Sequence, residues 1–433
     1  MEREGGVKLT FYVSRLTLSA TALRVVLFKG VIISMKEYHT KQLRNVVLLG
    51  HGSAGKTSLA EALAFTTGAV NRMGEVEKGT TIADFSEEEI ERHISLSLAL
   101  VPVEWKNCKI NVLDTPGYTD FVGEVKSASR VADLALIVVD AVSGVEVGTE
   151  LVWKFADQQE LPRMVVINKL DRENASVERT LEALEETFDQ NFVLVQLPIG
   201  TEAEFSGVVD VMKMEASVGR EGERGEIPSH MADLVEEAHV ELVETAAEAD
   251  DELIIKYLEG EKLTEAEILQ GLRTAVLNRT AVPVLLTAAT ANLGTHTLLE
   301  ALVSYAPSPV DRGGCTAEGP TGEEQIEPDD LAPLAALVFK TTADPFVGKL
   351  TYFRVYGGIM ESDNRVYNSR AEEEERLGQI YVMRGKEQIP MPRVHAGDIG
   401  AVAKLQTTVT GDTLCDKDYP LVLPGITFPH PFS

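Results

Sequence analysis

Cysteine is scarce, and the sequence has no long apolar run. The 433 residues contain three cysteines, Cys108, Cys315 and Cys415, which lie far apart and lack the spacing of metal ligands. So few thiols favour a reducing, cytoplasmic location. A membrane-spanning helix needs roughly 18 or more apolar residues, and the best candidate is interrupted by Arg24 and Lys29. We therefore expect no membrane partner.

Positive charge is also in deficit. The chain has 40 Lys and Arg against 68 Asp and Glu, a net charge of −28. This balance argues against a protein that coats nucleic acid, so we expect no DNA partner, while a local basic contact stays open. Residues 202–267 hold twenty acidic and five basic side chains. Such a run fits either a solvated helical face or a surface that steers a partner.

The first 34 residues match no targeting signal. They have neither a signal-peptide core with a small-residue cleavage site nor an amphipathic transit pattern. Met35 would be a natural start, so we expect residues 1–40 to be a disordered or mis-assigned extension. The remaining length predicts two or three domains.

A phosphate-binding loop follows the apolar run 46–49. Residues 50–57 have the pattern GxxxxGK[ST], and a helical stretch comes next. In such a loop backbone N–H groups surround the β-phosphate, Lys56 neutralises the β- and γ-phosphates, and Thr57 offers its hydroxyl to Mg²⁺. A Gly-rich turn with a surface lysine is the competing interpretation, which the strand–loop–helix order disfavours. The expected nucleotide contacts here are Gly50, His51, Gly52, Ser53, Ala54, Gly55, Lys56, Thr57 and Ser58.

Strand-like runs alternate with helical patterns from residue 46 to 310, which predicts a doubly wound α/β domain. Pro and Gly residues then predict a linker, and short runs with turn signals predict a small all-β barrel. The expected strands of the first domain are 46–49, 109–113, 134–139, 164–167 and 282–286. Those of the barrel are 334–340, 348–355, 363–367, 375–383 and 400–404.

A tetrad that indicates which nucleotide base is bound follows a predicted strand. It consists of Asn168, Lys169, Leu170 and Asp171. The Asp171 carboxylate can accept hydrogen bonds from N1–H and the 2-amino group of guanine, whereas adenine offers neither donor. Asn168 is expected to contact the base edge and hold the phosphate loop, and Lys169 to pack over the ring. The nucleotide is therefore expected to be GTP or GDP.

The motif Asp114, Thr115, Pro116 and Gly117 follows the strand 109–113. Asp114 is expected to reach Mg²⁺ through a water, because that ion keeps much of its hydration shell. The Gly117 N–H is placed to sense the γ-phosphate. Loss of that phosphate would free the loop, which is how such proteins convert hydrolysis into a change of shape.

Together these motifs resemble those of the translational GTPases, and of elongation factor G in particular. Residues 114–121, DTPGYTDF, resemble that family's DTPGHVDF, and longer similar stretches occur at 197–212, 247–260, 333–356 and 396–414. Elongation factor Tu shares the switch motifs but lacks an insertion in its GTP-binding domain, which disfavours it. The resemblance implies a G domain at 41–310 with an inserted α/β subdomain at 172–280, a linker at 311–330, a β-barrel domain II at 331–418, and the start of a truncated third domain at 419–433.

The sequence departs from this family at chemically sensitive positions. Ser95 stands where the family has a threonine that contacts Mg²⁺, and it keeps the hydroxyl, so Thr57, Ser95 and Asp114 are the expected metal contacts. Ser53 replaces an aspartate, which removes support for a structural monovalent cation. Gly52 replaces an isoleucine, and together with Ser53 and Tyr118 it resembles the divergent paralogs of the family.

The largest departure is Tyr118, which replaces the histidine that positions the attacking water. A tyrosine hydroxyl can orient water but cannot carry the imidazolium charge, so hydrolysis is expected to slow while binding persists. Tyr118, Lys56 and Gly117 are the candidate catalytic residues. A fifth guanine-contact motif would be Ala288 and Ala289, where a plain strand end is an equal alternative.

The resemblance implies a GTP hydrolase that acts on the ribosome, with rRNA and the stalk protein region as partners and a monomeric state off the ribosome. The acidic helix expected at 229–248 would face the stalk, or would be only a solvated surface. A GTP-dependent ribosome-binding regulator with little hydrolysis and a fragment of a ribosome protection factor are the alternatives.

Overall fold

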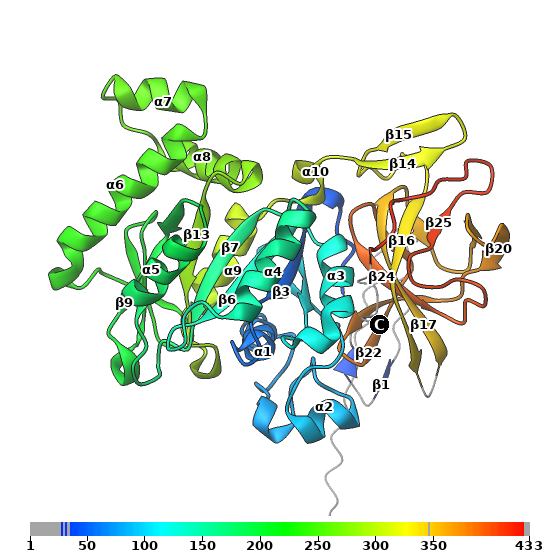
Figure 1. The fold of residues 1–433 in the computed structure, drawn as a ribbon, viewed down its shortest axis with the longest axis horizontal. Coiled ribbons are helices and arrows are strands. Elements are labelled where there is room, and N and C mark those ends of the chain that lie inside the picture. Colours follow the sequence, from blue (N-terminus) through cyan, green and yellow to red (C-terminus); the bar gives the residue numbers. More distant parts are fainter. Residues whose placement is uncertain (1–26, 29–30, 33–34, 345–346, 428–433) are drawn as a thin grey trace, which may run out of the picture. The chain divides into compact units, whose positions relative to one another are not determined.

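The computed structural model describes residues 27–28, 31–32, 35–344 and 347–427 (Figure 1). The chain divides into two units, Met1–Met35 and Lys36–Ser433. In the first unit, β1 (Leu27–Phe28) pairs antiparallel with β2 (Val31–Ile32). The expectation of a disordered or mis-assigned extension at residues 1–40 lies outside the described residues for 1–26, 29–30 and 33–34. Residues 35–40 are described, and Tyr38 and Thr40 are buried there, so this part is ordered. Of the helices in the described segments, none combines the length and the apolar character that a bilayer crossing needs.

A seven-stranded sheet forms the centre of the first domain. Its strand order is β4-β5-β3-β6-β7-β13-β8, and all neighbours are parallel except β4 and β5. Both faces of the sheet are covered, which is why its strands are continuous apolar runs. The doubly wound α/β prediction is confirmed. The strands are β3 (Leu43–Leu49), β4 (Ala99–Trp105), β5 (Cys108–Asp114), β6 (Leu134–Asp140), β7 (Arg163–Asn168), β8 (Phe192–Leu194) and β13 (Val282–Leu286).

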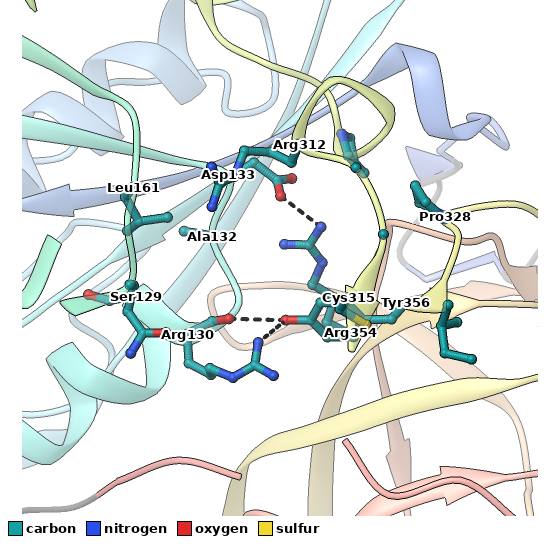
Figure 2. A pocket seen from close by; sticks show the side chains of 15 residues that line it. Ser129, Arg130, Ala132, Asp133, Leu161, Arg312, Cys315, Pro328, Arg354 and Tyr356 are labelled. Atoms are coloured by element: carbon teal, nitrogen blue, oxygen red, sulfur yellow. Dashed lines mark hydrogen bonds and ion pairs between the residues drawn. The ribbon is translucent and has the colours of Figure 1, made fainter. Parts of the chain in front are cut away.

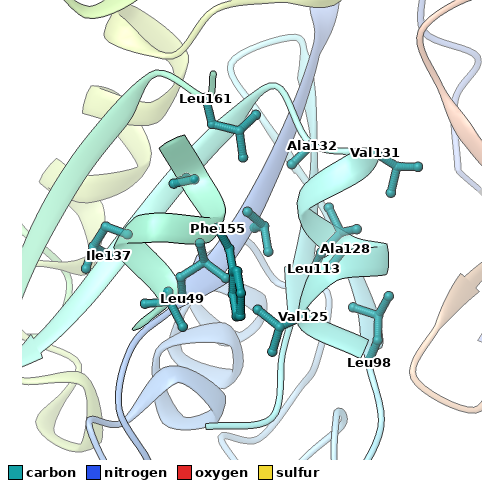
Figure 3. Close-up of a cluster of buried hydrophobic side chains, with 14 of the residues drawn as sticks. Leu49, Leu98, Leu113, Val125, Ala128, Val131, Ala132, Ile137, Phe155 and Leu161 are labelled. Carbon is teal, nitrogen blue, oxygen red and sulfur yellow. The ribbon is translucent and has the colours of Figure 1, made fainter. Parts of the chain in front are cut away.

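Helices cover the two faces because successive residues of a strand point to opposite sides. Leu48 packs in one core with Leu63 of α1, whereas Leu49 packs in another with Val125 of α3 and Phe155 of α4 (Figure 3). This places the loop after β3 at an edge where both helical layers meet the sheet. The helices of this domain are α1 (Lys56–Thr66), α2 (Glu87–Arg92), α3 (Val122–Arg130), α4 (Val147–Gln158), α5 (Val177–Thr187), α9 (Thr295–Tyr305) and α10 (Pro309–Arg312).

Between β8 and β13 the chain adds a smaller α/β layer. Four antiparallel strands lie in the order β12-β11-β10-β9. The range 172–280, predicted as an inserted subdomain, also contains α5 and β8, and β8 pairs in parallel with β13, so it completes the central sheet. The added elements are β9 (Gln196–Ile199), β10 (Gly207–Asp210), β11 (Glu215–Val218), β12 (Glu223–Gly225), α6 (Ala232–Glu248), α7 (Asp251–Leu258) and α8 (Glu265–Asn278).

An antiparallel, barrel-like domain follows. Its eight-stranded sheet has the order β20-β19-β25-β16-β17-β24-β21-β22, and β18 pairs with β23. Val338, Phe353 and Leu414 lie in its core. The strands are β16 (Ala335–Asp344), β17 (Gly348–Gly357), β18 (Met360–Glu361), β19 (Arg365–Asn368), β20 (Glu373–Arg376), β21 (Ile380–Arg384), β22 (Glu387–Met391), β23 (Arg393–Val394), β24 (Ile399–Ala403) and β25 (Thr413–Cys415).

Two segments differ in detail from the sequence patterns. The run 375–383, predicted as one strand, contains the end of β20 and the start of β21, with Gly378 between them. The segment 311–330, predicted as a linker, contains an antiparallel hairpin of β14 (Cys315–Gly319) and β15 (Gly322–Ile326). Gly319 and Pro320, two of the residues that suggested a linker, lie at the turn of this hairpin.

Buried charges join the barrel to the G domain. Arg354 of β17 donates from Nη2 to Asp133 Oδ1 at 2.8 Å, with side chains 5% and 3% exposed. Lys109 of β5 contacts both carboxylate oxygens of Asp398 at 2.9 and 2.8 Å. Figure 2 shows the Arg354–Asp133 pair beside Tyr356, at a cavity of about 130 Å³. Separating the two domains would leave each of these buried charges without its partner, which is costly. The contacts therefore hold the two domains together.

Candidate nucleotide-binding site

The loop between β3 and α1 is held in a tight conformation by its glycines. Gly50 and Gly55 have φ of +155° and +96°. A Cβ on Gly50 would lie 2.4 Å from the carbonyl oxygen of Val138, and one on Gly55 would lie 2.4 Å from Asn168 Nδ2. Only glycine fits such close approaches without movement of the neighbours. The loop therefore presents its backbone, as phosphate binding requires.

Lys56 lies at the first turn of α1 with its ammonium folded back over the loop. Its Nζ donates to the carbonyl oxygens of Gly50 at 3.0 Å and His51 at 2.9 Å. Burial lowers the pKa of Lys56 to about 8, and the Asp114 carboxylate acts in the opposite direction. A second anion close to Nζ, such as a phosphate, would favour the charged ammonium.

Four oxygen-bearing side chains gather beside this lysine. Thr57 Oγ1 donates to Asp114 Oδ2 at 2.8 Å and lies 2.9 Å from Ser95 Oγ. Ser95 is also hydrogen-bonded to Asp84. Asp114 Oδ1 and Asp84 Oδ2 are buried and have no hydrogen-bond partner among the described residues.

These two carboxylates are costly to keep charged in their surroundings. Burial, together with the charge of the nearby Asp84, raises the pKa of Asp114 to about 7. Burial likewise raises the pKa of Asp84 to about 6. A divalent cation would favour both charged forms, and carboxylate and hydroxyl oxygens are the ligands that Mg²⁺ prefers. Thr57, Ser95 and Asp114 therefore fit the predicted magnesium contacts, and Asp84 joins them.

The loop after β5 closes on the phosphate loop. Thr115 Oγ1 donates to the carbonyl oxygen of Leu48 at 2.6 Å, and Pro116 is buried. A Cβ on Gly117 would lie 2.6 Å from both Lys56 Nζ and the Cα of Gly52. Gly117 thus has no room for a side chain, and its backbone lies beside Lys56, the residue predicted to neutralise the phosphates.

Tyr118 lies over the same loop, with 43% of its surface exposed. A Cβ on Gly52 would lie 3.2 Å from Cζ and 3.3 Å from Cε1 of the Tyr118 ring. The ring therefore packs against the bare backbone of Gly52. The absence of a side chain at residue 52 is what makes room for the tyrosine.

At the base-recognition motif, Asn168 links three loops. Its Nδ2 donates to the carbonyl oxygen of Ala54 at 3.1 Å, and its Oδ1 accepts from Thr287 Oγ1 at 3.1 Å and from the N–H of Ala289 at 3.0 Å. The N–H of Ala288 donates to the carbonyl oxygen of Leu293. The two alanines thus lie beside the tetrad, with their N–H groups engaged within the protein.

The rest of the tetrad is also ordered by local contacts. Lys169 adopts φ +66° and its Nζ forms an ion pair with Asp140 Oδ2 at 2.6 Å. The N–H of Leu170 donates to the carbonyl oxygen of Thr287 at 3.3 Å. Asp171 Oδ1 is buried and has no partner among the described residues. A buried carboxylate oxygen of this kind fits a ligand that brings its own N–H donors.

A cavity of about 220 Å³ collects most of these residues. Seven further residues of its wall were not among the predicted contacts; they come from the segment 76–95 and from the loops after β7 and β13. His51 turns toward α4, where its Nε2 lies 3.5 Å from Glu146. Predicted contacts in the wall are Gly52, Ser53, Gly55, Lys56, Thr57, Ser58, Ser95, Thr115, Gly117, Tyr118, Asn168 and Lys169. The additional residues are Val76, Glu77, Asp84, His93, Ile94, Arg172 and Thr290.

A phosphate loop after the first strand of a parallel sheet, an oxygen-rich cation site and an NKxD tetrad define a P-loop GTPase domain. The model of the elongation factor Tu GTP binding domain matches residues 41–308, and that of elongation factor G domain 2 matches residues 333–417. The chain belongs to the translational GTPase family.

A solved structure supports the same assignment. The chain is similar to a protein from Thermus thermophilus whose crystal structure is known, with 33% sequence identity and a TM-score of 0.78. The similarity covers 87% of this chain and 54% of the other. The chain therefore spans about half the length of that protein.

Proposed function

We propose that this chain is the GTP-hydrolysing part of an elongation factor G-like protein, which binds GTP with Mg²⁺ and hydrolyses it in contact with the ribosome. The proposal rests on two buried carboxylate oxygens that have no hydrogen-bond partner among the described residues. One belongs to the motif at 114–117 and the other to the tetrad at 168–171. Asp171 Oδ1 suits the donors of guanine, and Asp114 Oδ1 suits a cation with its water shell. Both belong to loops that Asn168 and Thr57 connect to the phosphate loop.

The proposed division of labour follows from the contacts. Lys56 holds the β- and γ-phosphates, and the bound Mg²⁺ would neutralise developing charge on the transferred phosphoryl group. Thr57, Ser95, Asp84 and Asp114 hold and orient that ion. The Gly117 backbone N–H senses the γ-phosphate, so hydrolysis would release the loop that carries Tyr118.

We propose the ribosome as partner, with the rRNA and the stalk protein region as its contact sites, and a monomer off the ribosome. The exposed face of α6 carries Glu236, Glu237, Glu241 and Glu244. Burial raises the pKa of Glu241, and the neighbouring carboxylates Glu185, Glu237 and Glu244 act in the same direction. Such a face would attract a basic partner surface and repel an acidic one. The proposed domains are the G domain at 41–310 and the barrel at 331–418.

Single-turnover GTP hydrolysis tests this function. The chain is loaded with radiolabelled GTP and Mg²⁺ and mixed with ribosomes or with buffer alone. Ribosomes should accelerate phosphate release, and Lys56→Ala should abolish it because the phosphates lose their buried counter-charge. Equal rates with and without ribosomes in the parent chain would contradict the proposal.

A GTP-dependent ribosome-binding regulator with little hydrolysis is the second candidate. The packing of Tyr118 on Gly52 favours it, since the ring occupies the approach to the phosphate loop and carries no cationic group. A Tyr118→His variant separates the two functions. If the parent turns over slowly and Tyr118→His is faster by about tenfold or more, the regulator is supported. Rapid stimulated turnover by the parent would exclude it.

A further inference from the structure

Two histidines and an aspartate from distant parts of the chain meet outside the nucleotide site. His39 precedes β3, Asp330 lies between β15 and β16, and His395 follows β23. One ligand atom from each lies within 4.8 Å of the others. We refer to these three residues as the His39–Asp330–His395 cluster. We propose that this cluster binds a transition-metal ion of the Zn²⁺ class and thereby joins the start of the G domain to the barrel.

The separations of the ligand atoms suit such an ion. Asp330 Oδ2 lies 2.9 Å from His395 Nδ1 and 3.5 Å from His39 Nδ1. Zinc binds imidazole nitrogens and carboxylate oxygens at about 2.0–2.2 Å in a tetrahedron, which puts neighbouring ligand atoms roughly 3.3 Å apart. The two distances bracket that value. The third distance, between the two nitrogens, can shorten because the His39 side chain is 69% exposed.

The surrounding contacts resemble the support that metal ligands usually have. His395 is 7% exposed, and its other nitrogen, Nε2, lies 3.2 Å from Glu37 Oε2. A metal-bound histidine almost always donates its second ring N–H to a carboxylate or carbonyl oxygen, which fixes the ring. The other oxygen of Asp330, Oδ1, accepts from the N–H of Ala396 at 3.1 Å. His395 Nδ1 and Asp330 Oδ2 are hydrogen-bonded to each other at 2.9 Å, so a bound ion would replace the proton that they share.

The local charge also suits a divalent cation. Asp330 and Glu37 supply two negative charges, and Arg393, 3.7 Å from Glu37, supplies one positive charge. Neutral imidazoles and carboxylates are ligands for zinc, copper, iron and nickel, whereas magnesium and calcium prefer sites made of oxygen alone. With three protein ligands, the fourth position of the tetrahedron would take a water.

The segments that carry the cluster are already positioned by other contacts. Thr40 Oγ1 donates to the carbonyl oxygen of Ala396 at 2.9 Å, so the residues next to His39 and His395 are hydrogen-bonded. Because the ligands are 291 and 65 residues apart along the chain, a bound ion would close long loops. An ion that binds the folded chain alone raises its stability by mass action. Zinc should therefore raise the melting temperature of the chain.

Zinc titration of the full chain tests the proposal. The protein is treated with a chelator, dialysed into excess Mg²⁺ and GDP so that the nucleotide site is occupied, and titrated calorimetrically with Zn²⁺. We expect one Zn²⁺ per chain, a higher melting temperature, and the visible absorption of tetrahedral Co²⁺ when cobalt replaces zinc. Absence of saturable binding would overturn the proposal and leave the cluster as a hydrogen-bonded triad.

Variants localise the ion. His39→Ala changes an exposed side chain and should leave the fold intact, while weakening Zn²⁺ binding by at least about 100-fold; Asp330→Asn should do the same. Glu37→Gln should weaken it by about 10-fold, as loss of a supporting carboxylate does elsewhere. His230→Ala, an exposed histidine remote in sequence, is the matched control and should bind as the parent does. Unchanged affinity in His39→Ala and Asp330→Asn would place the ion elsewhere and refute the site.

Discussion

Replacement of Asp171 by asparagine should change the base preference of the nucleotide site from guanine to xanthine. Asp171 Oδ1 is buried without a hydrogen-bond partner among the described residues. A carboxylate there can accept from N1–H and from the 2-amino group of guanine. Asparagine keeps one acceptor but turns an NH₂ group toward the guanine amine, so two donors face each other. Xanthine carries a carbonyl oxygen at that position and can accept from the same NH₂ group.

The size of the effect follows from the hydrogen bonds involved. A bond to a charged group contributes about 1.5–3 kcal/mol, and a buried donor left unpaired costs about 1–3 kcal/mol. These terms add to about 2.5–6 kcal/mol, and the middle of that range, roughly 3–5 kcal/mol, is the expected loss against GTP. Since about 1.4 kcal/mol is a factor of ten, the affinity for GTP should fall by about a hundredfold to a few thousandfold. The two side chains have nearly the same shape, so the surrounding loop should be preserved.

Competition with a fluorescent guanine nucleotide measures this change. GTP, XTP and ATP are titrated against the parent, Asp171→Asn, and Asp189→Asn, a matched control at an exposed position. The parent and the control should prefer GTP, and Asp171→Asn should prefer XTP. If Asp171→Asn binds GTP within about threefold of the parent, the orphaned oxygen has no role in base recognition and the argument fails.

Two further predictions concern the loop and the domain interface. Gly55→Ala should weaken GTP binding by about tenfold or more, because the new Cβ would clash with Asn168 Nδ2 and a left-handed alanine is strained by about 1–2 kcal/mol. Gly68→Ala, where φ is +75° and the space around the Cβ is open, is the control. Equal affinities for the two variants in the same competition assay would contradict the clash. Arg354→Met should lower the free energy of unfolding by about 3 kcal/mol in a urea titration, since Asp133 loses its buried counter-charge. The double variant Arg354→Met with Asp133→Leu should recover much of that stability. An unchanged free energy of unfolding in Arg354→Met would show that the buried pair does not stabilise the fold.

Much of this fold could be predicted because its signals are local. The strands after which the phosphate loop and the tetrad occur are buried on both faces, so their sequences are short apolar runs that stand out from the helices. Lys56 and Asp171 were assigned from motifs whose spacing reflects contact with one ligand. The structure brings Lys56, Thr57, Asp114 and Asn168 together around the loop as the motifs indicated.

The features that escaped sequence analysis depend on tertiary contacts. Asp84 lies in an irregular segment without periodicity, and its role follows only from its hydrogen bond to Ser95 and its closeness to Asp114. The hairpin β14–β15 was predicted as a linker because Pro and Gly residues, among them Gly319 and Pro320, are dense there. Two short runs around such a turn also indicate a hairpin. β8 could not be assigned to the central sheet, since its partner β13 is about 90 residues away along the chain.

The contact between Gly52 and the ring of Tyr118 restricts the order in which this pair of residues can arise. A branched side chain at residue 52 would occupy the volume that the ring now fills. A lineage that begins with such a side chain must therefore acquire the glycine before the tyrosine, because the reverse order passes through an overpacked loop. Histidine at residue 118 would leave a space above Gly52 that the tyrosine ring now fills.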